Sequence, residues 1–161
     1  MRRFPKGHKL TTKEQTEVAK TVCELFNVKW WFYAKEKDAF ASAWADPEQG
    51  EVHISYQEGR TYSRLMSFLM HEICHVLAYR QNKFMGYHAA PYDNWTKEAL
   101  IKYKRTALKA EVWVEKQTEK WSKVLDFRFE NSYDDKGVRK AFIKKINDFV
   151  QDELNRLETE N

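Results

Sequence analysis

Cysteine is scarce in this chain, and no long apolar run occurs in it. The 161 residues include two cysteines, Cys23 and Cys74, which lie far apart without a CxxC spacing. Such cysteine usage is typical of a reduced compartment, so we expect a cytoplasmic protein. No segment approaches the ~18 apolar residues of a membrane span. No apolar stretch follows the basic N-terminal MRRFPKGHK, so a secretory signal is not expected.

Repeats, low-complexity tracts and linkers are also missing, which predicts a single domain over residues 1–161. Aromatic residues make up 15% of the chain, which is typical of a packed globular protein. The formal net charge is +4, but the lysines are spread over several helical segments, as on a solvated surface. A nucleic-acid partner would need a denser cluster on one face and has little support.

Hydrophobic periodicity predicts one helix, three strands and three further helices. Thr11 and Glu14 stand at capping-box spacing at the start of the first helix. A Pro/Gly turn, DPEQG, joins the second and third strands into a hairpin. The predicted elements are a helix at 10–26, strands at 28–34, 39–45 and 51–56, a helix following Gly59, a loop at 85–93, and helices at about 95–125 and 138–157.

The segment HEICH, residues 71–75, lies within the helix that follows Gly59. His71 and His75 are four residues apart, so their side chains project from one face and can bind one Zn²⁺. Glu72 is then placed to take a proton from a water activated by the metal. The alternative is a pair of ordinary surface histidines. The helix is apolar on both sides of the motif, however, and polar side chains there need a partner. Cys74 projects elsewhere and is expected to be a small buried residue.

A catalytic zinc site usually has three protein ligands and one water. Glu111 falls at the edge of the apolar stripe of the helix at 95–125 and is a candidate for the third ligand. Small neighbours in that stripe would let another helix approach closely. Glu115 and Glu119 rotate progressively outwards and are expected to be solvated.

His88, in the loop that follows the motif helix, is the competing third ligand. His88, Tyr87 and Tyr92 could instead hydrogen-bond a substrate carbonyl or an oxyanion as accessory catalytic groups. His8 and His53 have no partner at ligand spacing, and we expect them to be structural.

These motifs resemble those of minimal gluzincin metallopeptidases, most of all the ImmA/IrrE type and related phage-encoded metallopeptidases. The segment FLMHEICHVLA is similar to their HExxH helix, and LKAEVWVEKQTEKW looks like their Glu-Ala-Trp helix, with Glu111 at the position of the third ligand. The resemblance covers about residues 28–125. It implies an α+β, zincin-like fold: a small three-stranded, mostly antiparallel sheet packed on the HExxH helix, with one N-terminal and two C-terminal helices.

Two classes of function follow. The first is a zinc endopeptidase with Zn²⁺ held by His71, His75 and Glu111, and with Glu72 as general base. The resemblance implies a protein or peptide substrate, such as a repressor or host target, in the host cytoplasm if the chain is phage-encoded. SprT-like metalloproteases are the alternative enzyme, with His88 as third ligand. The second class is a non-catalytic interaction protein on a zincin scaffold. The oligomeric state stays open.

Overall fold

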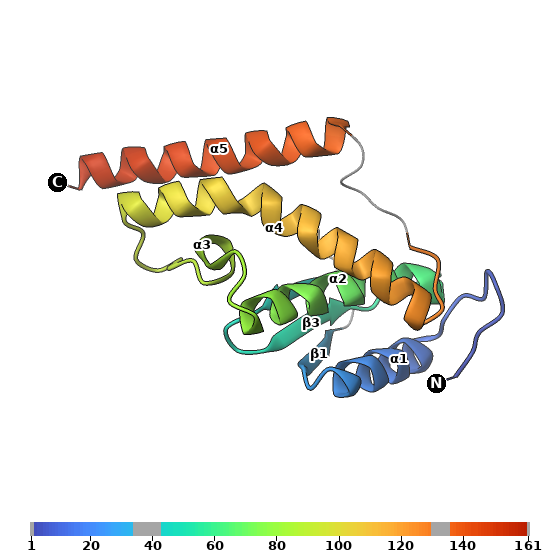
Figure 1. Ribbon diagram of the computed structural model, residues 1–161. Helices are drawn as coiled ribbons and strands as arrows, with labels where there is room; N and C mark the ends of the chain where they lie inside the picture. Colours follow the sequence, from blue (N-terminus) through green and yellow to red (C-terminus); the bar gives the residue numbers. More distant parts are fainter. Residues whose placement is uncertain (1, 34–42, 130–135, 161) are drawn as a thin grey trace.

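Five helices and three strands make up the described residues, 2–33, 43–129 and 136–160, of the computed structural model. The architecture is α+β, as the sequence predicts. Residue 34 of the strand predicted at 28–34 and residues 39–42 of the strand predicted at 39–45 lie outside the described residues. The loop predicted at 85–93 begins with a short helix. The elements are α1 (Thr12–Leu25), β1 (Lys29–Tyr33), β2 (Ala43–Asp46), β3 (Glu51–Ser55), α2 (Tyr62–Arg80), α3 (Met85–His88), α4 (Lys97–Val124) and α5 (Lys136–Thr159) (Figure 1).

The three strands form one mixed sheet in the order β1-β3-β2. β2 and β3 pair antiparallel through the predicted hairpin. β1 pairs with β3 in parallel, with Trp30 opposite Val52 and Phe32 opposite Ile54. The expectation of a mostly antiparallel sheet is therefore wrong, because β1 joins the outer side of β3 instead of extending the hairpin beside β2. This order leaves β2 as an edge strand among the described strands.

Alternate residues of the strands face opposite sides of the sheet. Val52 and Ile54 of β3 are buried in the main hydrophobic cluster, together with residues of α1 and α2. On the other face, Trp31, His53 and Trp44 lie directly opposite one another across the three strands. The His53 ring stacks on Trp44 with centroids 3.7 Å apart and planes 6° apart. His53 is thus a structural residue of this aromatic ladder, as the sequence predicts.

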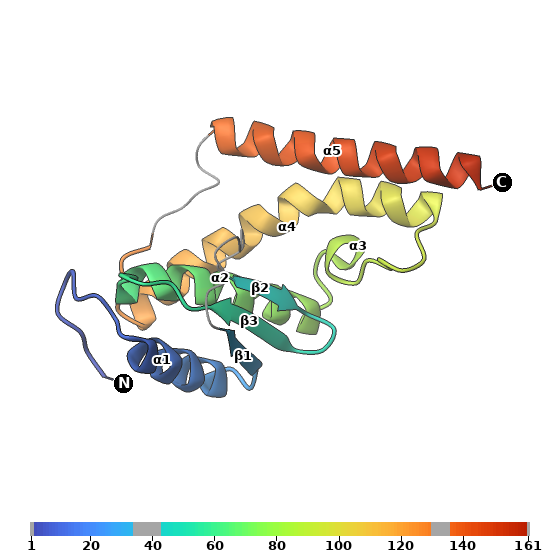
Figure 2. The ribbon, with the colours of Figure 1, turned by 180° about the vertical axis from the view of Figure 1, so that it is seen from behind.

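α2 is packed between the sheet and α4 (Figures 1 and 2). Thr61 begins it as a helix cap, since its side chain accepts a hydrogen bond from the backbone N–H of Arg64 at 3.3 Å. α2 is rich in apolar residues. No helix among the described residues, however, has the length and composition needed to cross a bilayer. The fully buried residues of α2 are Leu65, Met66, Leu69, Met70, Ile73, Cys74, Val76 and Ala78.

A second, smaller hydrophobic cluster joins the first half of α4 to α5, and both views show α5 running alongside that half (Figures 1 and 2). Beyond this contact α4 also packs on α2 and α3. Glu111 lies near the middle of α4 and is only 6% exposed. The cluster is formed by Trp95, Leu100, Tyr103, Ala107, Ile146 and Val150.

The short helix α3 depends on Gly86 for its contact with α4. A Cβ atom at this position would lie 2.9 Å from the Lys102 carbonyl oxygen, which is too close for an unstrained contact. We therefore expect Gly86→Ala to lower the free energy of unfolding by about 1–3 kcal/mol. Urea unfolding followed by circular dichroism measures the change. Ala89→Ser, at the exposed end of the same helix, is the control, and equal stabilities of the two variants would contradict the expectation.

Candidate metal centre

The middle of α2 presents the two motif histidines from one face of the helix. The Nε2 atoms of His71 and His75 lie 3.2 Å apart, and His75 is the more buried of the two rings. Cys74 points into the core, where its sulfur contacts the Thr118 hydroxyl at 3.7 Å. Cys74 is therefore a buried residue, as the sequence predicts, and lies outside the histidine cluster.

α4 brings Glu111 to the two histidines. Its Oε2 atom lies 2.9 Å from His71 Nε2, and its Oε1 atom lies 3.3 Å from His75 Nε2. One ligand atom from each residue lies within 4.8 Å of the others. Nitrogen and oxygen atoms bound tetrahedrally to zinc at about 2.0–2.1 Å are about 3.3 Å from one another. The three atoms are thus spaced as ligands of one such ion would be.

His88, the competing third ligand, lies behind His75 instead. Its Nδ1 atom must donate to the Lys83 carbonyl oxygen, 2.9 Å away, because a carbonyl oxygen only accepts. Burial lowers the pKa of His88 to about 4, so its ring is neutral near pH 7 and its Nε2 atom accepts. The 2.8 Å bond from His75 Nδ1 to that atom therefore carries the proton of His75. This leaves the lone pair of His75 Nε2 facing Glu111.

Glu115 is the outer hydrogen-bond partner of His71, as His88 is of His75. Its Oε1 atom lies 3.1 Å from His71 Nδ1, and the residue is only 5% exposed. A carboxylate that accepts from Nδ1–H leaves the lone pair of Nε2 free for a metal. The expectation that Glu115 is solvated is therefore wrong, whereas Glu119 is exposed as predicted. The spacing of four residues from Glu111 was the available signal, because it places Glu115 on the same helical face.

Of the two tyrosines in the segment predicted as a loop, Tyr87 lies in α3 and reaches the candidate metal centre. Its hydroxyl donates to Glu111 Oε1 at 2.7 Å and so fixes the carboxylate. Tyr92 is 61% exposed, and its ring packs edge to face on Trp95 and Tyr103. Tyr92 lines the cavity that leads to the centre, which is the structural position of this predicted accessory group.

The facing atoms of the centre suit a cation. With Nδ1 of both rings donating outwards, the neutral forms of His71 and His75 direct only lone pairs towards Glu111. The Oε2 atom of Glu111 is buried and accepts no well-directed hydrogen bond, despite its short distance to His71. Buried lone pairs that face one another are stabilised by a positive charge between them. Two imidazole nitrogens and one carboxylate oxygen are a donor set that fits zinc.

In metal-free protein, this centre favours a proton on His71. Burial lowers the pKa of His71, but the adjacent carboxylates of Glu111 and Glu115 outweigh it and raise that pKa well above 6.5. Burial also raises the pKa of Glu111, but His75 and His71 hold it well below 4.5. A metal that binds here must therefore displace a proton from His71.

Zinc affinity should consequently depend on pH. Below the raised pKa of His71 the competing proton is present, so the apparent affinity should rise with pH by up to about tenfold per unit. Calorimetric titrations with zinc near pH 6 and pH 8, in buffers of different ionisation enthalpy, would measure both the affinity and the proton release. Equal affinities with no released proton would contradict this expectation.

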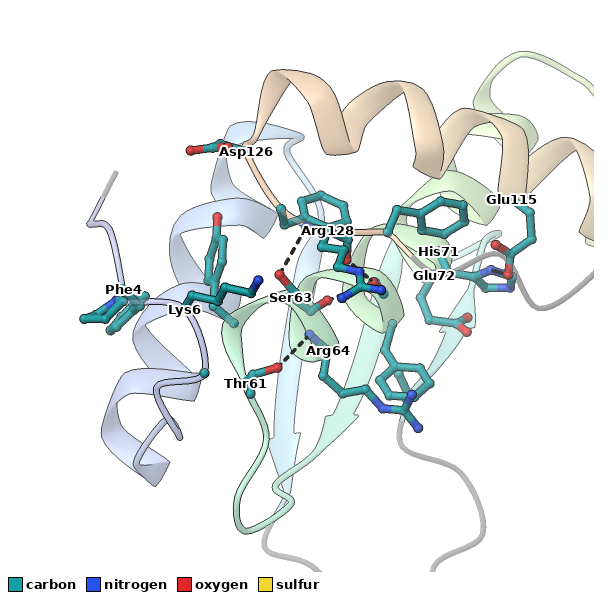
Figure 3. A pocket seen from close by; sticks show the side chains of 18 of the residues that line it. Phe4, Lys6, Thr61, Ser63, Arg64, His71, Glu72, Glu115, Asp126 and Arg128 are labelled. Carbon is teal, nitrogen blue, oxygen red and sulfur yellow. Dashed lines mark hydrogen bonds and ion pairs between the residues drawn. The ribbon is translucent and has the colours of Figure 1, made fainter.

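Glu72 lies beside the ligand cluster and does not join it. Figure 3 shows its carboxylate directed into a cavity, next to His71 and Glu115. Burial raises the pKa of Glu72, although the neighbouring His71 and His75 oppose the change. A carboxylate with a raised pKa is a better proton acceptor than a solvated one. The position predicted for a general base is thus partly buried and open to a cavity.

Two cavities meet at this point. The first, here named the Phe68 cavity, has a volume of about 850 Å³ and extends past the start of α2 to residues 126–129. The second, the Tyr92 cavity, has a volume of about 940 Å³ and extends along β2 and the segment after α3. Ala43, His71 and Glu72 line both cavities, so together they form a groove that passes the candidate metal centre.

His8 lies outside this groove. Its Nε2 atom is 3.0 Å from a carboxylate oxygen of Glu14, and the same carboxylate accepts the backbone N–H of Thr11 at 3.0 Å. Thr11 and Glu14 form the predicted capping box at the start of α1. His8 is therefore structural, as the sequence predicts.

The outer partners of the histidines lead to a testable expectation. His88→Ala and Glu115→Ala should each weaken zinc binding about 10–100-fold, because the rings lose the bonds that orient them. Competition with a chromophoric chelator measures the affinities. Glu119→Ala, at an exposed position of α4, is the control, and its zinc affinity should match that of the unaltered protein. Unchanged affinity in both outer variants would contradict the orienting role.

Comparisons of the chain with protein-family models, with curated proteins and with solved structures find no match. The function is therefore inferred from the geometry of His71, His75 and Glu111, with Glu72 beside them in the groove.

Proposed function

We propose that this protein is a zinc-dependent peptidase that resembles the minimal gluzincins. The observation that carries the proposal is the convergence of His71, His75 and Glu111, whose ligand atoms face one another at zinc-ligand spacing. Their outer partners leave each imidazole with an Nε2 lone pair aimed at the same point. Glu72 adds a carboxylate in the groove, which a purely structural metal would not require.

Zn²⁺ in such a site supplies a Lewis acid that lowers the pKa of water towards neutrality and polarises a carbonyl oxygen. Glu72 takes the proton of the attacking water as the new C–O bond forms. The same carboxylic acid then gives that proton to the leaving amine as the C–N bond breaks, so the residue returns to its ionised form. Tyr87 holds Glu111 through its hydroxyl, and His88 keeps His75 in the required tautomer.

The groove favours an extended peptide as substrate. β2 runs along the Tyr92 cavity from Ala43, which lines both cavities, to Asp46. An edge strand offers backbone N–H and C=O groups with which an added peptide strand can pair. Pairing there would lay the peptide across the candidate metal centre. We place this activity in the cytoplasm, where the free, buried cysteines Cys23 and Cys74 would stay reduced.

The test is hydrolysis of a mixed set of quenched fluorogenic peptides by protein that is freed of metal and then given one equivalent of Zn²⁺. We expect cleavage that zinc restores and that a chelator abolishes. Mass spectrometry of the products would show a single water added across a peptide bond. Bound zinc without cleavage of any peptide in the set would contradict the proposal and favour the non-catalytic interaction protein.

A further inference from the structure

Positive charge is concentrated on the exposed side of α4. The exposed residues of this helix include eight lysines and arginines against two carboxylates, Glu98 and Glu119. This surplus of cations is larger than the net charge of the whole chain, +4, so the remaining residues together are slightly acidic. Although lysines occur in several helices, the excess charge of the molecule therefore lies on one of them.

Six of these exposed cations form a row along one face of α4, here named the basic face. At about 100° per residue they fall within an arc of about 60°, and at about 1.5 Å per residue the row is about 31 Å long. Glu111 and Glu115, which contact the motif histidines, lie more than about 100° away around the helix and are buried. The basic face consists of Lys102, Arg105, Lys109, Lys116, Lys120 and Lys123.

The cations of the basic face are not neutralised by their neighbours. None of the six forms an ion pair with another residue that the structure describes, whereas Lys144 of α5 pairs with Asp148 at 2.6 Å. Arg105, Lys109 and Lys120 also have no carboxylate three or four residues away in the helix. Their neighbours at these spacings include further cations, and such like-charge pairs repel one another. A bound polyanion would relieve this repulsion.

The side chains of the basic face favour the phosphate backbone of a duplex. Five of the six cations are lysines, which contact phosphates as point charges and do not read bases bidentately. The length of the row is close to that of one turn of duplex DNA, about 34–36 Å.

Two other polyanions fit the basic face less well. A nucleic-acid single strand stacks its bases on aromatic rings. The exposed aromatic residues of the described part of the chain lie on β1, on β2 and after α3, and none lies on α4. An anionic membrane needs large apolar side chains beside the cations. Ile101 and Val124, which are exposed on α4, lie outside the row.

We propose that the protein binds double-stranded nucleic acid through the basic face of α4, without dependence on base sequence. The dense cluster on one face that such a partner requires is present there. The inference goes beyond the proposed peptidase and does not depend on it. None of the six cations lines either cavity, so the groove at the candidate metal centre stays open when a duplex is bound.

The experiment measures fluorescence anisotropy of a labelled duplex of about 30 base pairs, as DNA and as RNA, over about 50–200 mM salt. Lys109→Glu/Lys120→Glu reverses two charges of the basic face, and Lys109→Gln/Lys120→Gln removes them. Lys13→Glu/Lys20→Glu, at exposed positions of α1, is the matched control, because it makes the same change in composition and net charge. Circular dichroism and zinc content verify that each variant is folded.

With six phosphate contacts, we expect the logarithm of the binding constant to fall with the logarithm of salt concentration at a slope of about −5. Lys109→Glu/Lys120→Glu should weaken binding on the order of 10–100-fold and reduce the slope by about 2, and the glutamine variant should show a smaller loss. The α1 control should stay close to the unaltered protein.

Equal losses in the two glutamate variants, or duplex binding that salt does not weaken, would overturn the inference. Tighter binding to vesicles of anionic lipid than to either duplex would also overturn it. Duplex binding without peptide cleavage would support the basic face while contradicting the peptidase. Peptide cleavage by a protein that binds no duplex would support the peptidase and overturn the inference.

Discussion

Replacing Glu72 with glutamine should lower peptide hydrolysis by about 10²–10⁴-fold, because glutamine keeps the shape of the side chain but cannot accept a proton. Such a loss corresponds to about 3–5 kcal/mol of transition-state stabilisation. Zinc binding should stay close to that of the unaltered protein, since Glu72 is not one of the three clustered ligand residues. The raised pKa of Glu72, which follows from its burial, makes it a stronger proton acceptor than a solvated carboxylate.

Steady-state kinetics on a cleaved peptide, together with zinc titrations, would measure the two effects separately. Glu119→Gln makes the same chemical change at an exposed position of α4 and should leave both activity and affinity unaltered. Full activity in Glu72→Gln would show that another group takes the proton. Loss of zinc binding in the same variant would instead make Glu72 part of the metal centre.

Replacing Glu111 with alanine should have the largest effect on zinc binding among variants of α4. The change removes the only carboxylate among the three facing ligand residues and leaves His71 and His75 as a two-nitrogen site. We expect the affinity to fall by more than the ~100-fold that marks the upper end for an outer partner of a ligand. Activity should fall with it, because the chemistry of zinc is lost at concentrations that saturate the unaltered protein.

The order in which the variants weaken zinc binding distinguishes a metal ligand from a residue that only orients a ligand. Glu111→Ala should weaken zinc binding more than His88→Ala, and His88→Ala more than the exposed control Glu119→Ala. Chelator competition on all three variants gives this order in one experiment. The reverse order for Glu111 and His88 would make His88 the third ligand and favour the SprT-like alternative.

Much of this geometry follows from patterns in the sequence. The i, i+4 spacing of His71 and His75 on an apolar helix is enough to predict that both rings face one point. The position of Glu111 beside the small residues Ala107 and Ala110 predicts a buried acid where another helix comes close, and Glu111 is only 6% exposed. These features depend on local periodicity, which a sequence displays directly.

Other features depend on contacts that local periodicity does not display. Glu115 shares a helical face with Glu111 but lies farther from the apolar stripe, and it is buried where His71 of α2 lies against it. The parallel pairing of β1 with β3 depends on which edge of the hairpin β1 joins. α3 forms where Gly86 allows the chain to approach the backbone of α4. Each of these depends on tertiary packing, which overrides local preference.

The most direct test of the proposed metal centre is the zinc content of the protein after purification without chelator and after dialysis against Zn²⁺, measured by inductively coupled plasma mass spectrometry. The geometry of His71, His75 and Glu111 predicts one zinc ion per chain in the unaltered protein. It also predicts substantially less in His75→Ala at the same free zinc concentration. A chain that takes up no zinc, or a His75→Ala variant that retains a full equivalent, would contradict the assignment.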